Sequence, residues 1–395
     1  MKKTKLNLFN YLKLVPNRLR KIEDASSDDV KPLHAYKPNA LAAILHPEVQ
    51  HLTVSKVKAL SADVKLYRLT PDAERGTKRL SPFSAGAYIS VDVKIDGCTY
   101  SRPYSIASSP LESSEFYEIA VKRVPGGVVS AYIHEKWTVG TSVTASGPCG
   151  EFTYEPLRDA ETVVCAAGGV GITPFRSMAR AVAEGSESFN MILLYCARRE
   201  EDLIFKDEFD EMRGIKVVYV LSDEEKPGFE HGFADANLIK KYAPAGEYSL
   251  FVCGPRTMYG FTQKETKKLG LRRKFVRFEA QGQINEPRKE PDYETADRES
   301  YNVTVIQNGT EKTVVCRADE PILCALERGG ISAPSRCRSG ECGFCHSRLV
   351  SGKCYVPSSC DGRREADKIY GYIHPCAAFP REDVTIEVPG RTVQN

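Results

Sequence analysis

Four cysteines near the C-terminal end carry the most specific chemical signal in this sequence. Cys337, Cys342 and Cys345 stand in a C-x4-C-x2-C spacing, and Cys376 follows well downstream. This spacing is typical of thiolates that hold a [2Fe–2S] cluster, because a short loop containing glycine can wrap closely enough to present three ligands to two irons. A zinc site would usually show a second pair of closely spaced ligands, and none follows here. The pattern therefore predicts a carrier of single electrons.

The fourth ligand is not determined by spacing alone, because Cys354 and Cys360 also lie in the interval. Cys376 leads through residues 377–380 into a strand-like segment at 384–388. This context resembles the end of plant-type ferredoxins, in which the last ligand sits just before the closing strand. We therefore assign the fourth ligand to Cys376.

The bulk composition limits the class of protein. A length of 395 residues suggests two to four domains, and a formal net charge of +3 gives no global field of the kind that marks a nucleic-acid binder. There are 13 cysteines, and Cys165, Cys196 and Cys253 lie in apolar runs, which indicates buried thiols in a reducing compartment. The sequence shows neither an apolar run of about 20 residues nor a signal-peptide core, so we expect a cytoplasmic protein.

Residues 1–52 match no recognisable module, and we treat them as an extension of unknown role. Residues 1–21 contain several Lys and Arg but no acid, and Leu8, Phe9, Leu12 and Val15 fall at helical spacing. This predicts a basic amphipathic helix that could lie on an anionic membrane surface or dock a partner. A loosely packed extension is the alternative. A second short helix is expected over residues 39–45.

Residues 53–157 have the pattern of a small antiparallel β-barrel. Short segments alternate apolar and polar residues, as half-buried strands do, and turn residues separate them. The expected strands are residues 53–57, 64–69, 87–93, 117–121 and 142–146.

Polar and glycine residues in this barrel could hold a phosphate and a flat ring. Arg102 follows a strand and offers a fork of donors to a phosphate, and Tyr104 offers an aromatic face. Gly127 and Ser130 open an expected helix over residues 130–136, where backbone amides form a phosphate cradle. Either signal alone would be weak, because such glycines often just make a turn.

Taken in order, three motifs resemble the flavin domain of the ferredoxin–NADP reductase superfamily: R-x-Y-S at 102–105, G-x-x-S at 127–130 and G-P-x-G-x-F at 147–152. The resemblance implies a bound flavin, with Ser105 donating near its N5 atom. The last motif is more typical of FAD members than of phthalate dioxygenase reductase, so we expect FAD and not FMN. The implied flavin-binding residues are Arg102, Pro103, Tyr104, Ser105, Gly126, Gly127, Val128 and Ser130.

Residues 158–282 switch to alternating strands and helices, which predicts a doubly wound parallel sheet. An apolar strand at 162–167 leads into a glycine loop at 168–171, and then into a helix with Thr173 as N-cap and Pro174 in its first turn. Strand, glycine loop and helix together form a nucleotide-phosphate turn. The loop is not the G-x-G-x-x-G dinucleotide fingerprint.

The form G-G-x-G-I-T-P resembles the pyridine-nucleotide loop of the same superfamily, and the Cys-Gly-Pro turn at 253–255 is a second such mark. In that family the cysteine approaches the nicotinamide, although Cys253 could also be a small buried hydrophobe at a strand end. The implied nucleotide-binding residues are Gly168, Gly169, Gly171, Thr173, Pro174, Cys253, Gly254 and Pro255. The implied catalytic residues are Ser105, Thr173 and Cys253.

The choice between NADH and NADPH depends on charge. Acids at 223–225 follow the expected strand 215–221 and suit a free ribose, whereas Arg198 and Arg199 follow the previous strand and would suit a 2′-phosphate. We expect NADH, with NADPH as the alternative.

Residues 283–300 are charged and contain two prolines, so they are expected to be a linker. In residues 301–395, a hairpin around Asn308-Gly309 and a helix over 321–328 precede the cysteine loop, an arrangement that resembles the β-grasp of a [2Fe–2S] ferredoxin. The multidomain order of flavin barrel, α/β nucleotide domain and ferredoxin resembles the phthalate dioxygenase reductase and hybrid-cluster protein reductase types.

This resemblance implies an NAD(P)H-dependent electron-transfer reductase. Electrons would pass from NADH through FAD and the [2Fe–2S] cluster to a partner redox protein or oxygenase, and no nucleic acid is expected as a partner. The alternative is a non-catalytic redox sensor, or a structural electron-transfer subunit of a larger complex. A monooxygenase in its own right lacks a recognisable oxygen-activating site.

Overall fold

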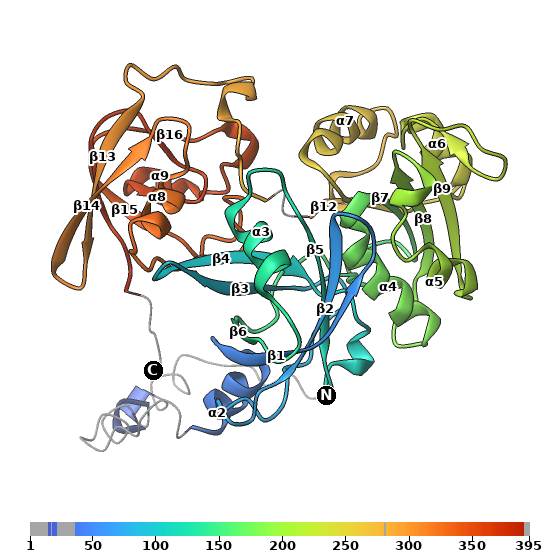
Figure 1. Ribbon diagram of the computed structural model, residues 1–395, viewed down its shortest axis with the longest axis horizontal. Coiled ribbons are helices and arrows are strands. Elements are labelled where there is room, and N and C mark those ends of the chain that lie inside the picture. Colours follow the sequence, from blue (N-terminus) through green and yellow to red (C-terminus); the bar gives the residue numbers. More distant parts are fainter. Residues whose placement is uncertain (1–14, 17, 22–35, 280–281, 391–395) are drawn as a thin grey trace. The chain divides into compact units, whose positions relative to one another are not determined.

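The computed structural model describes residues 15–16, 18–21, 36–279 and 282–390, which belong to two units, 1–47 and 48–395. In the first unit, helix α2 spans Lys37–Leu45, two residues earlier than expected (Figure 1). Most of the predicted amphipathic helix, including Leu8, Phe9 and Leu12, lies outside the described residues, so its role stays a prediction. Within the described part, no helix has the length and apolar character to cross a membrane.

The first sheet of the second unit is antiparallel and has the strand order β4-β3-β6-β1-β2-β5. Leu52, Tyr67, Ile89 and Tyr117 are fully buried in its core. Its elements are β1 (Gln50–Ala59), β2 (Val64–Pro71), β3 (Tyr88–Ile95), β4 (Cys98–Ser105), η2 (Pro110–Glu112), β5 (Tyr117–Lys122), α3 (Val128–Lys136) and β6 (Ser142–Ala145). The sheet thus begins at Gln50, inside the segment that we assigned to the N-terminal extension.

One expectation about this sheet is wrong. Residues 102–105 lie inside β4 and not after a strand, because β4 pairs with β3 along its whole length, up to Tyr88 opposite Ser105. Pro103 has no N–H to donate, but β4 is an edge strand, where proline is tolerated.

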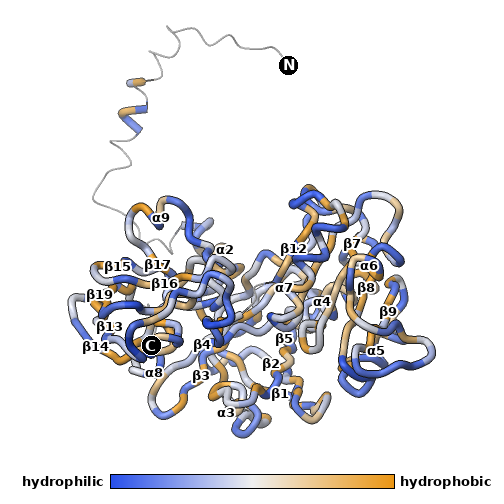
Figure 2. Tube along the Cα trace, turned by 90° about the horizontal axis from the view of Figure 1, so that it is seen from above, coloured by the Kyte–Doolittle hydropathy of each residue, from blue (hydrophilic) through white to orange (hydrophobic). Residues whose placement is uncertain are grey.

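The second sheet is parallel, as expected, with the order β10-β9-β8-β7-β11-β12. Successive residues of β7 and β11 are buried on both faces, and hydrophobic residues follow the central strands (Figure 2). Its strands are β7 (Thr162–Gly168), β8 (Asn190–Ala197), β9 (Ile215–Leu221), β10 (Glu230–His231), β11 (Ser249–Cys253) and β12 (Val276–Phe278). Its helices are η3 (Gly169–Ile172), α4 (Thr173–Ala183), α5 (Lys206–Glu211), α6 (Ala236–Tyr242) and α7 (Arg256–Thr266).

Thr173 is not the N-cap that the sequence suggested. It already has helical backbone angles and is the first residue of α4, directly after the short helix η3. Its hydroxyl donates to the carbonyl of Val170 at 3.0 Å, so it closes the preceding turn and does not cap α4. Pro174 lies in the first turn, as expected.

The third sheet has the order β14-β13-β19-β15-β17, and a small ribbon pairs β16 with β18. The turn between β13 and β14 is the expected one, because Asn308 and Gly309 both have positive φ angles (51° and 76°), as a two-residue hairpin requires. Its elements are β13 (Ser300–Gln307), β14 (Thr310–Arg317), α8 (Ile322–Arg328), β15 (Ser347–Ser351), β16 (Cys354–Tyr355), α9 (Glu365–Ile369), β17 (Tyr372–Ile373), β18 (Phe379–Pro380) and β19 (Val384–Glu387).

Residues 283–300 are held against the ferredoxin part more firmly than is expected of a linker. Ile284 is buried in the core of the third sheet and Tyr293 packs against the same core. Asp292 accepts hydrogen bonds from the Tyr355 hydroxyl at 3.2 Å and from the Ser358 amide at 2.8 Å. Composition missed this docking because a few anchoring residues are enough to hold a charged segment in place.

The first two sheets share one hydrophobic core. Val64, Leu66 and Phe152 of the barrel pack in the same cluster as Phe175 and Phe251 of the nucleotide part. The ring of Phe152 lies 5.6 Å from that of Phe175 and 5.3 Å from that of Phe251, between ring centres.

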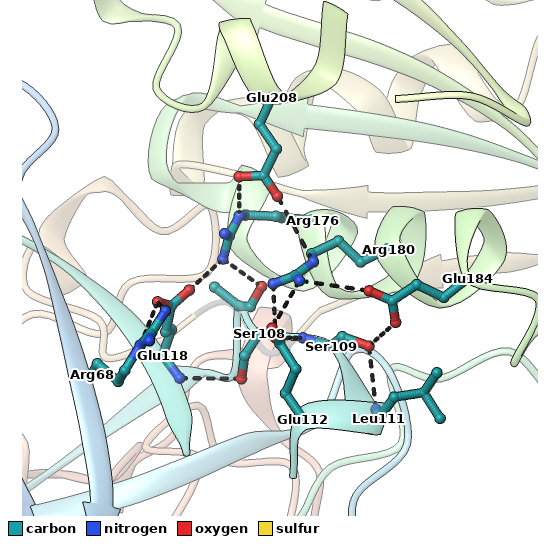
Figure 3. A network of polar contacts seen from close by, with 11 residues as sticks. Arg68, Ser108, Ser109, Leu111, Glu112, Glu118, Arg176, Arg180, Glu184 and Glu208 are labelled. Atoms are coloured by element: carbon teal, nitrogen blue, oxygen red, sulfur yellow. Dashed lines mark hydrogen bonds and ion pairs between the residues drawn. The ribbon is translucent and has the colours of Figure 1, made fainter. Parts of the chain in front are cut away.

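Beside this core lies a buried polar network (Figure 3). Arg176 of α4 donates to Glu118 of β5 at 2.9 Å, to the Ala107 carbonyl at 2.9 Å and to Glu208 at 2.8 Å. Arg180 donates to Glu112 of η2 through two nitrogens. These contacts attach the helix after the glycine loop to the flavin barrel.

Candidate functional site

A cavity of about 1750 Å³ collects most of the residues that the sequence singled out. Ligand pockets usually measure about 300–1,000 Å³, so this one has room for more than one small molecule. Of the predicted flavin and nucleotide residues, its walls contain Pro103, Tyr104, Ser105, Gly126, Gly127, Val128, Gly168, Gly169, Gly171, Thr173, Cys253, Gly254 and Pro255. Arg102, Ser130 and Pro174 are predicted residues that do not line it.

The glycine loop and the Cys-Gly-Pro turn touch each other at the nucleotide side of this cavity. A Cβ added to Gly171 would lie 2.5 Å from the Cys253 carbonyl oxygen, and one added to Gly168 would lie 2.9 Å from Pro255. Gly169 has a φ of 53° and open space around it. Glycine is required at 168 and 171 because the backbones of the glycine loop and the Cys-Gly-Pro turn approach closely there. The open space at Gly169 leaves room for a phosphate.

Three polar side chains meet in the cavity wall. The hydroxyl of Ser105 donates to one carboxylate oxygen of Glu279 at 2.7 Å, and the thiol of Cys253 donates to the other at 2.5 Å. Burial raises the pKa of Glu279 and also that of the Cys253 thiol. The structure therefore joins two predicted catalytic residues through an acid that sequence reasoning missed. The signal that could have found Glu279 is its position directly after the last strand of the parallel sheet.

At the flavin side of the cavity, the side chain of Ser130 holds the turn before α3 in place through hydrogen bonds. Ser130 accepts a hydrogen bond from the Val124 amide at 3.1 Å and donates to the Gly127 carbonyl at 3.3 Å. A Cβ on Gly127 would lie 2.8 Å from the Ser130 hydroxyl, whereas Gly126 has a φ of 71° and open space. Ser130 thus shapes the turn, and the glycines face the cavity.

Arg102 departs from its expected place. Its Nη1 atom donates to the carboxylate of Glu327 in α8 at 3.1 Å and 3.3 Å, and to the Ser101 carbonyl at 2.8 Å. The guanidinium is therefore engaged with the ferredoxin part of the chain, because β4 packs against α8.

The four predicted cluster cysteines gather in one place as two pairs. The sulfurs of Cys345 and Cys376 lie 3.4 Å apart, and the thiol of Cys342 hydrogen-bonds that of Cys337. That bond and those from the amides of Ser339 and Cys342 lower the pKa of the Cys337 thiol, and the same contact between the two thiols raises the pKa of Cys342. Within the described residues, no three His, Cys, Asp or Glu side chains converge on one metal ion. Pairs of thiols suit a two-iron cluster, in which each iron takes two protein ligands.

The two competing cysteines are placed differently. The thiol of Cys360 donates to the Pro357 carbonyl at 3.5 Å, and Cys354 lies in the ribbon strand β16. The pairing of Cys376 with Cys345 therefore supports Cys376 as the fourth ligand.

Tyr88 is a second residue that sequence reasoning missed. It lines the cavity, and burial together with the nearby thiols of Cys149, Cys342 and Cys337 raises the pKa of its hydroxyl. Cys337 lines the same cavity. The cluster loop therefore borders the space that the flavin and nucleotide residues enclose.

The residues that bear on nucleotide choice lie at the edge of this cavity. Arg198 and Ser222 line it, and the Ser222 hydroxyl donates to Asp223 at 2.6 Å. Asp223, which suits NADH, and Arg198, which would suit NADPH, are thus neighbours, since the Asp223 amide donates to the Arg198 carbonyl at 3.0 Å.

Comparisons with known proteins agree with this division of the chain. The model of the oxidoreductase FAD-binding domain matches residues 51–154, that of the oxidoreductase NAD-binding domain matches residues 166–264, and that of the 2Fe-2S iron-sulfur cluster binding domain matches residues 305–381. The fold and the site therefore define an NAD(P)H-dependent oxidoreductase that uses FAD and a [2Fe–2S] cluster.

Known relatives cover most of the chain. The glycine betaine monooxygenase reductase subunit of Pseudomonas aeruginosa is 27% identical, over 77% of this chain and 87% of that protein. Ferredoxin–NADP reductase B of Sorangium cellulosum is 32% identical, over 52% of this chain and 88% of that protein. The solved structure of phthalate dioxygenase reductase is 26% identical with a TM-score of 0.63, and covers 86% of this chain and 98% of its own.

The chain belongs to the ferredoxin–NADP reductase family, as a reductase with a C-terminal [2Fe–2S] domain. It is an electron-transfer enzyme that passes electrons from NAD(P)H through FAD and the cluster to an acceptor protein. This confirms the fold class, the cofactors and the function that the motifs predicted.

Proposed function

We propose that this chain is the reductase component of an oxygenase system and delivers single electrons from NADH to a separate oxygenase. The observation that carries the proposal is one continuous cavity, whose wall contains the Ser105–Glu279–Cys253 contacts and the cluster cysteine Cys337. The relatives named as reductases of glycine betaine monooxygenase and phthalate dioxygenase support an oxygenase as the acceptor.

The proposed assignment of groups to residues follows the cavity walls. Tyr104 and the turn of Gly126 and Gly127 would hold FAD, the ring on the aromatic face and the phosphates at the N-terminus of α3. The glycine loop 168–171 and Thr173 would hold the nucleotide, and the proposed cluster ligands are Cys337, Cys342, Cys345 and Cys376. When bound, FAD converts a two-electron hydride into single electrons, and the cluster carries them one at a time.

The protein contributes alignment. Because Glu279 accepts from both Ser105 and Cys253, it fixes the hydroxyl and the thiol in one geometry, and we propose that this orients Ser105 toward the reactive edge of the flavin. Burial raises the pKa of Glu279, while the hydrogen bonds from Cys253 and Ser105 act in the opposite direction. The proposed domains are residues 53–157 for FAD, 158–282 for the nucleotide and 301–395 for the cluster, with residues 50–52 added to the FAD part because β1 begins at Gln50.

The preference for NADH is part of the proposal and has its own test. Asp223 places a carboxylate beside Ser222 at the cavity edge, where it would repel a 2′-phosphate. We expect Asp223→Ser to improve kcat/KM for NADPH relative to NADH by about tenfold, which corresponds to about 1.4 kcal/mol. Asp207→Ser, an acid in α5 that does not line the cavity, is the control. An unchanged ratio of kcat/KM for NADPH to that for NADH would show that Asp223 does not contribute to the choice of nucleotide.

A cytoplasmic location is proposed from the cysteines. All 13 lie in the described residues and none of them forms a disulfide, as expected in a reducing compartment.

Anaerobic titration with NADH tests the function directly. Purified protein, loaded with FAD, iron and sulfide, should lose its flavin absorbance and then show the electron paramagnetic resonance signal of a reduced [2Fe–2S] cluster. An oxygenase that co-purifies should accept those electrons at a rate that depends on the reductase. Protein that stays without colour after this loading would contradict the proposal.

Ser105→Ala separates chemistry from binding. We expect flavin reduction in stopped-flow to slow about 100-fold, the size of misplacing groups at a reacting centre, while the FAD content stays unchanged. Ser61→Ala is the matched control, because Ser61 lines the same cavity but donates to Asp63 at 2.9 Å, away from Glu279. Equal rates in wild type and Ser105→Ala would remove Ser105 from the catalytic set.

A further inference from the structure

Glu327 joins two parts of the molecule through its buried carboxylate. It lies in the last turn of α8 and is 4% exposed. Its carboxylate accepts a hydrogen bond from the backbone amide of Ser101 at 2.9 Å and from Arg102 at 3.1 Å, both in strand β4 of the flavin barrel. It also accepts from Arg338 of the cluster loop at 2.8 Å. One buried carboxylate therefore binds the flavin barrel and the neighbour of Cys337.

Arg338 extends this contact around the cluster loop. Its side chain is 1% exposed, and its backbone has a positive φ of 59°, a conformation that a long side chain adopts at a cost. Its Nη2 atom donates to Gln283 at 2.8 Å and contacts the sulfur of Cys324 at 3.1 Å. Gln283 belongs to the segment that connects the nucleotide and ferredoxin parts. The loop that carries Cys337 is thus held from several sides.

The hydrogen bonds of Glu327 fix the orientation of the two parts that it joins. A buried carboxylate is stable only when donors satisfy it, and charge-assisted hydrogen bonds are short and restrict orientation. β4 runs directly from Ser101 and Arg102 to Tyr104 and Ser105, which line the cavity. Glu327 therefore links the cavity wall to the cluster cysteines through one strand and one side chain.

We propose that Glu327 is a positioning residue for electron transfer between the flavin site and the cluster, because it fixes the cluster loop against β4. This rests on the proposed function of the cavity and the cysteines. The step that it serves moves one electron from reduced flavin to one ferric iron, which becomes ferrous. No bond and no proton changes place at Glu327.

Glu327→Gln tests the proposal in the full-length protein loaded with FAD, iron and sulfide. The amide keeps the size of the side chain but loses its charge and one acceptor atom. Reduction of the cluster after flavin reduction should slow about tenfold, because a misplaced donor and acceptor react more slowly. Flavin reduction by NADH should stay within about twofold of wild type, because no Glu327 contact reaches the Ser105–Glu279–Cys253 group.

A readout without electron transfer is hydrogen exchange of the β4 backbone. The Ser101 amide should exchange faster in Glu327→Gln than in wild type, because it loses part of its buried acceptor. Glu320→Gln is the matched control. Glu320 lies just before α8 and binds Arg328 at 2.8 Å and the Arg317 amide at 3.3 Å, both within the ferredoxin part.

Unchanged exchange at Ser101 with unchanged cluster reduction would overturn the proposal, as would equal effects in Glu320→Gln. If Glu327→Gln does not take up a cluster, Arg102→Met tests the same bridge from the barrel side, and faster exchange at Ser101 with slower cluster reduction is the expected result. Slow cluster reduction without faster exchange would count against the bridge. Failure of wild-type protein to bind flavin or cluster would instead contradict the proposed function.

Discussion

The flavin barrel contacts its two neighbours in different ways. Toward the nucleotide part it shares a continuous hydrophobic core, in which Phe152 packs against Phe175 and Phe251, with the Arg176 network beside it. Toward the ferredoxin part, the hydrophobic clusters of the described residues stay separate, and Glu327 with its donors makes the principal polar contact.

This difference matches what each interface must do. A shared core resists separation, because every buried apolar group opposes it, and it would hold the proposed nucleotide and flavin sites together. A contact that depends on one carboxylate adds less stability but fixes orientation, since hydrogen bonds to a charged group are directional. Electron transfer needs orientation and proximity but no bond between the two sites.

The largest expected effect is at the cluster. Cys337→Ser should remove the electron paramagnetic resonance signal of the reduced cluster and lower reduction of a one-electron protein acceptor at least about 100-fold, because a ligand is lost. NADH reduction of ferricyanide by the flavin should persist, because the flavin and nucleotide parts share a core of their own. Loss of both activities would show that the two sides are not separable. Cys98→Ser, a half-buried thiol outside the loop, is the control.

Arg176→Ala should break the barrel–nucleotide interface. Arg176 and Glu118 are both almost fully buried, and removing Arg176 leaves Glu118 with Arg68 as its remaining partner and takes one donor from the Ala107 carbonyl, which costs about 1–3 kcal/mol of unfolding free energy. Thermal unfolding followed by flavin fluorescence should show a matching decrease in Tm. Arg123→Ala, which breaks the exposed pair with Glu135, should change stability by less than about 1 kcal/mol. Similar losses in both variants would refute the contrast.

Phe152→Leu should weaken the same interface more gently. The smaller side chain leaves a cavity between the rings of Phe175 and Phe251, and we expect a loss of about 1–2 kcal/mol in denaturant unfolding. The rate of cluster reduction should not change, because this core does not reach the ferredoxin part. A slower cluster reduction would indicate that the two interfaces are coupled.

Glu279→Gln should change the pH dependence of stability. Burial raises the pKa of Glu279 above its ordinary value of 4.5 while it faces Ser105 and Cys253, with Glu341 near enough for the two acids to interact. The folded protein therefore holds this proton more tightly than the unfolded chain, so wild-type stability falls as the pH rises from about 4.5 through the folded pKa. The variant should lack this fall, so its stability relative to wild type should increase over that window in urea unfolding. Parallel pH profiles would contradict the assignment.

Features that depend on a few neighbouring residues could be predicted from the sequence. The C-x4-C-x2-C spacing, the glycine loop and the Asn308-Gly309 turn each fix a local backbone path. The structure brings the sulfurs of Cys345 and Cys376 together, puts the glycine loop in the cavity wall and gives both turn residues positive φ angles. Thr173 was misjudged for a local reason, because the short helix η3 starts the helical turn before it.

Contacts between distant segments could not be predicted. Ser105 and Glu279 are 174 positions apart, and Arg102 and Glu327 are 225 apart. An arginine side chain suits a phosphate or a carboxylate equally well, and only the packing of α8 on β4, the strand that contains Arg102, selected the carboxylate.

The sequence by itself determined the cofactors and the order of the three parts, because cofactor ligands and phosphate turns are built from short segments with strict backbone and side-chain requirements. The tertiary structure alone decided which acid completes the cavity wall and which carboxylate holds the cluster loop. Those choices depend on burial and on donors from remote strands, which no local spacing specifies.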